Sequence, residues 1–71
     1  MNQAEKVKNY IKDKGSITSM EAFRNLGITR LSARVSDLRE MGVDVVTTWE
    51  TSTNVFGETS RYARYFIRKE E

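Results

Sequence analysis

The sequence predicts an α+β fold, with helices in the first 41 residues and strands in most of the remainder. Before Gly42, apolar side chains recur at intervals of three and four residues, which is the spacing of helices that bury one face. After Gly42, apolar and polar residues alternate, and β-branched and aromatic types become frequent, as in half-buried strands. Because the chain has only 71 residues, we expect one domain that covers residues 1–71.

Composition excludes several classes of protein. Apolar residues make up 38% of the chain and charged residues 31%, and no apolar run approaches the ~18 residues of a membrane span. The chain contains no cysteine and no histidine, so it lacks disulfides, thiolate ligands, the usual general base and the commonest metal ligand. We therefore expect no enzymatic activity, no cofactor, no metal, no small-molecule substrate and no membrane association. The N-terminus has no apolar signal-peptide core, which favours a cytoplasmic location.

The first helix is expected from about Gln3 to Lys14. Asn2 and Glu5 have the spacing of a capping box, in which each side chain accepts a hydrogen bond from the backbone of the other residue. Gly15 can adopt the left-handed conformation that ends many helices. Ser16-Ile17 then forms a short extended segment.

A second, shorter helix is expected from about Ser19 to Asn25. Thr18 has the position and chemistry of its N-cap, and Gly27 ends it. Phe23 lies on the same predicted face as Met20 and Leu26, so we expect Phe23 in the core.

A third helix is expected from about Arg30 to Met41. Ile28 is the predicted buried residue of the preceding turn, and Thr29 is the predicted N-cap. The residues expected to bury one face of this helix are Leu31, Val35 and Leu38.

The remaining chain predicts a β-hairpin. A three-residue loop that ends in a left-handed Gly57 would pair Asn54 with Glu58. This register places Trp49 opposite Ala63, Thr47 opposite Tyr65, Val45 opposite Ile67, and Asp44 opposite Arg68. The first three pairs form an apolar face, so we expect Trp49 and Tyr65 in the core. A shift by one residue would scatter that face.

Two helices joined by a tight glycine turn form a helix-turn-helix, and the hairpin that follows makes it winged. The segments Gly15-Ser16-Ile17-Thr18, Gly27-Ile28-Thr29-Arg30-Leu31-Ser32-Ala33-Arg34 and Ala63-Arg64-Tyr65 resemble a family of small winged helix-turn-helix domains common in bacteriophages and prophages. The resemblance covers about residues 3–67. It implies three helices, a short first strand and a C-terminal two-stranded wing. It also implies binding to double-stranded DNA by a regulator or architectural protein in the cytoplasm of a bacterial host cell.

In such a domain, the helix over about residues 30–41 enters the major groove and the wing over residues 50–62 rests on the DNA backbone. The candidate DNA-binding residues are Thr29, Arg30, Ser32, Ala33, Arg34, Ser36, Arg61 and Arg64. For Arg34, an ion pair with Asp37 three residues later is an equally good interpretation. The wing departs from many basic wings because polar residues replace lysines at its tip: Thr53, Asn54, Glu58 and Thr59.

A protein-interaction module is the alternative hypothesis, for example a phage inhibitor of a host protein. The net charge is only +2, which is modest for a DNA-binding protein. On the outer face of the predicted hairpin, Val46, Tyr62 and Phe66 surround Arg64, and an exposed apolar patch of this kind can bind a protein partner or form a homodimer.

Overall fold

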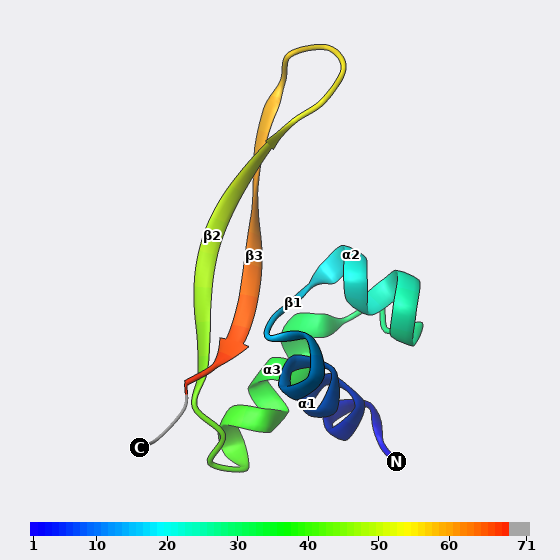
Figure 1. The fold of residues 1–71 in the computed structure, drawn as a ribbon, viewed down its shortest axis with the longest axis vertical. Coiled ribbons are helices and arrows are strands. Elements are labelled where there is room, and N and C mark those ends of the chain that lie inside the picture. The colour runs from blue at the N-terminus through cyan, green and yellow to red at the C-terminus, as the bar shows by residue number, and fades with distance from the viewer. Residues whose placement is uncertain (69–71) are drawn as a thin grey trace.

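The computed structural model describes residues 1–68 (Figure 1). Its elements, in chain order, are α1 (Gln3–Lys14), β1 (Ile17–Thr18), α2 (Ser19–Glu21), the π-helical turn η1 (Ala22–Leu26), α3 (Leu31–Glu40), β2 (Val45–Thr53) and β3 (Thr59–Ile67). The fold class is the predicted α+β class, with helices first and the hairpin last.

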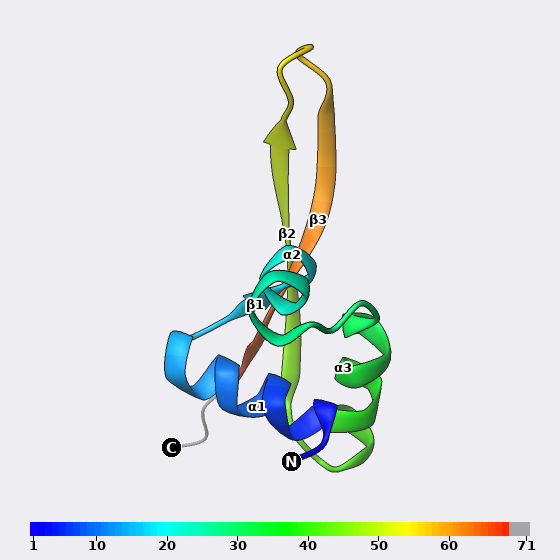
Figure 2. The same cartoon turned by 90° about the vertical axis from the view of Figure 1, so that its right-hand side faces the viewer.

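The helices cluster at one end of the molecule, and the β2–β3 hairpin projects far beyond them (Figures 1 and 2). The three strands form an antiparallel sheet in the order β1-β3-β2. The molecule measures 40 × 28 × 20 Å along its principal axes. The hairpin therefore has a basal part that contacts the helices and a distal part that is surrounded by solvent.

The predicted helix starts are confirmed for the first two helices. Asn2 Oδ1 accepts from Glu5 N at 2.8 Å, and Glu5 Oε1 accepts from Asn2 N at 3.3 Å. Thr18 and Glu21 repeat this exchange at the start of α2, with distances of 3.3 and 3.0 Å. Gly15 ends α1 with a φ of 97°, in the left-handed region that glycine adopts without strain.

The second helix differs from the prediction in its geometry. Only three residues are α-helical, and η1 then widens the helix into a π-turn before Gly27 ends it at a φ of 69°. The wider turn changes the angular step between side chains. Ala22 and Leu26 face the core, whereas Phe23 is 61% exposed and Met20, on the same side, is 63% exposed. The expectation that Phe23 is a core residue was wrong, because the face it shares with Met20 points to solvent.

The third helix begins one residue later than predicted. Arg30, not Thr29, occupies the N-cap position, with a φ of −122° and a ψ of 64°, and no side chain caps the helix. The expectation that Thr29 is the N-cap was therefore wrong. The predicted apolar face is confirmed, because Leu31, Val35 and Leu38 are buried.

One hydrophobic core joins the helices to the base of the sheet. Its most completely buried large side chains are Val7, Ile17, Ile28, Val35 and Leu38. Val45 is buried with them, and the half-buried Tyr65 and Ile67 pack against them. The expected burial of Tyr65 is therefore confirmed in part.

The predicted hairpin register is confirmed throughout. Thr47 pairs with Tyr65 and Trp49 with Ala63, and Asn54 N donates to Glu58 O at 2.9 Å across the loop. Asp44 and Arg68 form the predicted pair, with 3.5 Å between their charged atoms. Trp49 is nevertheless 61% exposed, so its expected place in the core was wrong. Its side chain lies on the face of the hairpin opposite to Tyr62 and Arg64, which are the side chains that α2 flanks at that level.

We expect Leu38→Ala to lower the free energy of unfolding by about 2–5 kcal/mol, because it shortens a fully buried side chain and leaves a cavity in the core. Urea denaturation followed by circular dichroism measures this change. Met41→Ala, at an exposed position just after α3, is the control and should change stability by less than about 0.5 kcal/mol. Equal stabilities of the two variants would show that α3 does not face the core as described.

Candidate nucleic-acid interface

The N-terminal half of α3 presents small polar side chains to solvent. Ser32 and Ser36 are exposed on the helix, Ala33 is half-buried beside them, and Thr29 and Arg30 are exposed in the preceding turn. Within residues 1–68, the Arg30 guanidinium has no ion pair and no side-chain hydrogen bond. No acidic residue occurs between Thr29 and Ser36. This surface, which we call the α3 face, combines a free cation with hydroxyl groups and little steric bulk.

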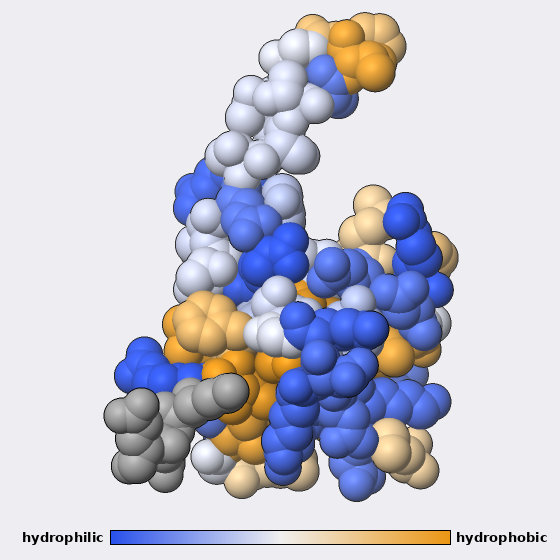
Figure 3. Space-filling view, viewed as in Figure 1, coloured by the Kyte–Doolittle hydropathy of each residue, from blue (hydrophilic) through white to orange (hydrophobic). Residues whose placement is uncertain are grey.

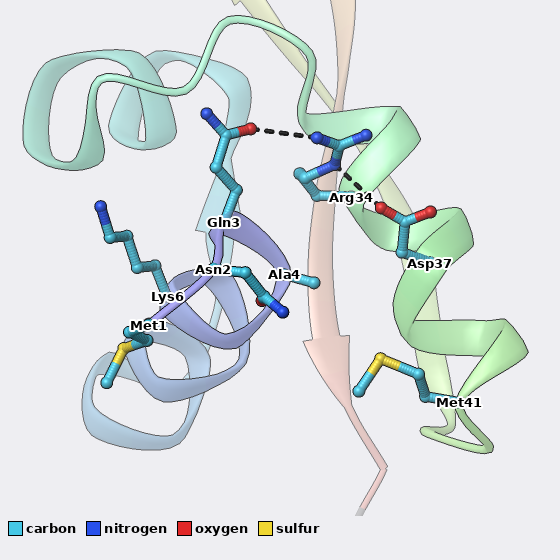
Figure 4. A pocket seen from close by; sticks show the side chains of 8 residues that line it. All are labelled: Met1, Asn2, Gln3, Ala4, Lys6, Arg34, Asp37 and Met41. Carbon is cyan, nitrogen blue, oxygen red and sulfur yellow. Dashed lines mark hydrogen bonds and ion pairs between the residues drawn. The ribbon is translucent and has the colours of Figure 1, made fainter.

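Arg34 is held within the protein. Its Nε lies 3.0 Å from Asp37 Oδ2, and its guanidinium also donates to Gln3 Oε1 at 3.1 Å. Figure 4 shows the guanidinium between these two partners. An open hollow of about 580 Å³ beside it is lined by the start of α1 and by one side of α3. Of the two interpretations of Arg34, the structure contains the ion pair with Asp37. The same side chain also joins the first helix to the third.

Arg39 also has a structural role. Its Nε and one terminal nitrogen donate to Val45 O at 3.2 and 2.9 Å, and that terminal nitrogen also donates to Thr47 Oγ1 at 3.0 Å. These bonds tie the C-terminal end of α3 to the start of β2. They therefore set the position of the helix relative to the hairpin.

Arg64 connects the hairpin to the helical part of the protein. Its Nε donates to Glu50 Oε2 at 2.9 Å across the β2–β3 pair. One terminal nitrogen donates to Ser16 Oγ at 3.0 Å and lies 3.7 Å from Glu21 Oε1. Glu21 Oε1 also accepts from Thr18 N at the start of α2. A single guanidinium thus links β2, the segment before β1 and the helix-turn-helix.

This arrangement shifts the pKa values of its members. The hydrogen bond from Arg64, followed by that from the Tyr62 hydroxyl, lowers the pKa of Glu50 because both favour the carboxylate. The bond that Tyr62 donates to Glu50 raises the pKa of Tyr62, because deprotonation would remove that bond. The pKa of Arg64 is also raised, chiefly by its bond to Glu50.

Arg61 is the exposed cation of the wing. Its guanidinium lies 4.9 Å from the centre of the Trp49 ring, at a distance typical of a cation–π interaction. Sequence analysis placed Arg61 in the candidate site but not Trp49. The hairpin register already indicated this contact, because Arg61 lies two residues from the partner of Trp49 and therefore on the same face of the hairpin.

The outer sheet face offers less apolar surface than the sequence predicts. Val46 and Phe66 are half-buried, and Tyr62 is 36% exposed. Arg64, at the centre of this face, is engaged by the contacts described above. The face is therefore a mixture of paired polar groups and partly covered apolar groups.

Neither a cluster of metal ligands nor a membrane-spanning helix occurs in the described part of the chain. Among residues 1–68, no group of three or more acidic side chains is placed to hold a metal ion. No helix in that range has the length and apolar character needed to span a membrane.

The sequence model of a protein family described as a winged helix-turn-helix domain matches residues 2–70. The chain belongs to this family. No curated protein and no solved structure shows a significant match to it. The winged helix-turn-helix fold suits nucleic-acid binding, with α3 as its second helix-turn-helix element and the β2–β3 hairpin as its wing.

Within this winged helix-turn-helix domain, the predicted site residues fall into two groups. Those that remain free to meet a ligand are Thr29, Arg30, Ser32, Ser36 and, on the wing, Arg61. Arg34 and Arg64 are engaged by protein partners, and Ala33 is half-buried. The sequence could not reveal the partners of Arg64, because Ser16 and Glu21 lie more than 40 residues away along the chain.

We expect the pKa of Glu50 to lie below that of an ordinary glutamate, which is about 4.3, and to rise in Arg64→Ala. Because the pKa of Glu50 is lower in the folded state than in the unfolded state, its contact with Arg64 stabilises the base of the wing at pH values above the unfolded-state pKa. This stabilisation is lost as the pH falls through the folded-state pKa. Titration of the carboxyl carbon signals by NMR measures both values. Arg68→Ala should leave Glu50 unchanged, and an unaltered Glu50 in Arg64→Ala would contradict the described network.

Proposed function

We propose that this domain binds double-stranded DNA, with the helix at about residues 30–41 in the major groove and the wing at residues 50–62 along the backbone. The observation that carries the proposal is the α3 face. Its free arginine and exposed serines form a non-acidic surface on the second helix of a helix-turn-helix. The N-terminal part of that helix is the part that reaches base edges in helix-turn-helix complexes.

The side chains of this surface suit the chemistry of the major groove. Arg30 can donate two hydrogen bonds to O6 and N7 of a guanine, the commonest specific contact between proteins and DNA. Thr29, Ser32 and Ser36 can donate or accept hydrogen bonds at base edges or phosphates. The small Ala33 permits close approach and can contact a thymine methyl group. Arg34 and Arg64 then act chiefly by positioning, since their guanidinium groups already hold other parts of the fold.

The proposed biological role is that of a phage or prophage regulator, or of an architectural factor, acting as one non-enzymatic domain in the cytoplasm of a bacterial host. The resemblance of residues 3–67 to small phage domains supports this role. In such a role, the domain would act by occupying DNA or by recruiting another protein. Selection of bound sequences from a random duplex library tests DNA binding and identifies the preferred site.

We expect Arg30→Ala to weaken binding to the selected site by about 1–3 kcal/mol and to relax the preference at one base position. The loss of a bidentate contact to guanine is the physical reason. Fluorescence anisotropy on the selected site and on its single-base variants measures both effects. Arg68→Ala is the matched control, because Arg68 lies at the other end of the hairpin and pairs with Asp44. Unchanged affinity and base preference in Arg30→Ala would exclude Arg30 from base recognition.

We expect the affinity to fall with increasing salt, because each phosphate neutralised by an arginine or lysine contributes about −0.9 to the slope of log affinity against log salt concentration. Arg61→Ala should make this slope shallower by about 1, since the exposed Arg61 is the wing cation available to a phosphate. Arg68→Ala should leave the slope unchanged. Absence of binding even in dilute salt would overturn the DNA-binding proposal and favour a protein partner.

A further inference from the structure

The tip of the wing carries two large apolar side chains that no other residue among 1–68 covers. Val55 is 93% exposed and Phe56 is 84% exposed. Figure 3 shows them as an apolar cap at the far end of a polar hairpin. They contribute nothing to the core, which lies at the other end of the molecule.

Hydrogen bonds centred on Asn54 hold this tip in one conformation. Asn54 Oδ1 accepts from the backbone N–H groups of Phe56 and Glu58, at 2.9 and 3.1 Å. Asn54 O accepts from Gly57 N at 3.0 Å, and Gly57 has a φ of 79° that other residues adopt only with strain. Because the loop is closed in this way, Phe56 is presented outward with little backbone entropy left to lose on binding.

The distal wing, residues 51–60, has no cation. Its one charged residue is Glu58, whose Oε1 accepts from Asn54 Nδ2 at 2.8 Å. Hydroxyl pairs line the strands below, with Ser52 and Ser60 at 3.5 Å and Thr53 and Thr59 at the same distance. Hydroxyl groups can bind phosphates as well as base edges, but without a cation the distal wing cannot neutralise a phosphate charge. The exposed apolar groups at its tip suit base faces.

The distal wing extends beyond the last contact that ties the hairpin to the helices (Figure 1). Glu50 is the last wing residue tied to the helical part of the protein, through Arg64. β2 continues for three further residues of about 3.3 Å each and ends at Thr53, roughly 10 Å beyond that point, where the loop begins. The tip therefore lies clear of the residues that hold the base of the wing.

We propose that Phe56 is an apolar wedge that enters the minor groove beside the major groove occupied by α3 and partly unstacks one base step. This inference rests on the proposed function, and it assigns to the wing tip a contact with bases instead of phosphates. Apolar side chains inserted in this way kink DNA by about 20–90°. The wedge makes the domain a DNA-bending protein as well as a binding one.

Energy transfer between dyes at the two ends of a duplex of about 30 base pairs carrying the selected site tests the wedge. Saturating wild-type protein should shorten the end-to-end distance. Phe56→Ala should abolish the shortening and weaken binding by about fivefold or more, as expected when one stacked aromatic contact is lost. Phe56→Leu, which keeps an apolar wedge, should restore much of the bend. Phe23→Ala is the matched control, since it removes another exposed phenyl group away from the wing.

Glu58→Gln gives a second, independent measurement. It preserves an acceptor for Asn54 but removes the negative charge beside Phe56, so affinity should rise if the tip lies between phosphate strands. The proposal is overturned if wild-type protein binds without bending, if Phe56→Ala bends DNA equally, or if Glu58→Gln leaves affinity unchanged. Each of these results would leave DNA binding by α3 intact and would assign the tip to a protein partner. Absence of DNA binding altogether would overturn both proposals.

Discussion

The pairing of β3 with both β1 and β2 is the constraint on which the rest of the structure depends. Tyr65 pairs with Ile17 on one side and Thr47 on the other, which brings the segment before the helix-turn-helix against the base of the hairpin. The same register places Arg64 opposite Thr18 and Thr48, where its side chain reaches Ser16, Glu21 and Glu50. The angle of the wing to the helices therefore depends on strand pairing, reinforced by the guanidinium groups of Arg64 and Arg39. The half-exposed ion pairs of Arg64 add orientation more than stability.

Five of the seven arginines of this small domain divide into two groups by their contacts. Arg34, Arg39 and Arg64 each join two or more elements through short contacts, because a planar guanidinium can donate in several directions at once. Arg30 and Arg61 instead expose their charge, the first before α3 and the second stacked on Trp49. The net charge of +2 is therefore a poor guide to phosphate binding. It understates the positive charge exposed at Arg30 and Arg61, whereas the total number of arginines overstates it.

The wing changes its chemistry along its length. Its base carries charged and aromatic groups that hold it to the helices or to one another, as in the Glu50–Arg64 and Trp49–Arg61 pairs. Its distal half is a hydroxyl-lined, nearly neutral ribbon that ends in Phe56. An element that inserts into a DNA groove requires an apolar tip held at a fixed distance from its base. Flexibility at the base would raise the free energy needed to keep the DNA bent.

The sequence by itself determined the features that arise between residues close along the chain. These include the two capping boxes, the glycine positions that end the helices, the buried stripe of α3 and the hairpin register, each set by contacts within a few residues or by a strict alternation. The tertiary structure decided which side chains are exposed and which residues far apart in the sequence contact each other. Trp49 and Phe23 have core-like chemistry, but Trp49 lies on the face of the hairpin that α2 does not flank, and Phe23 shares the exposed side of the second helix with Met20. For Arg64, likewise, only the folded chain brings Ser16 and Glu21 within reach, because strand order and packing, not local pattern, decide which distant residues meet.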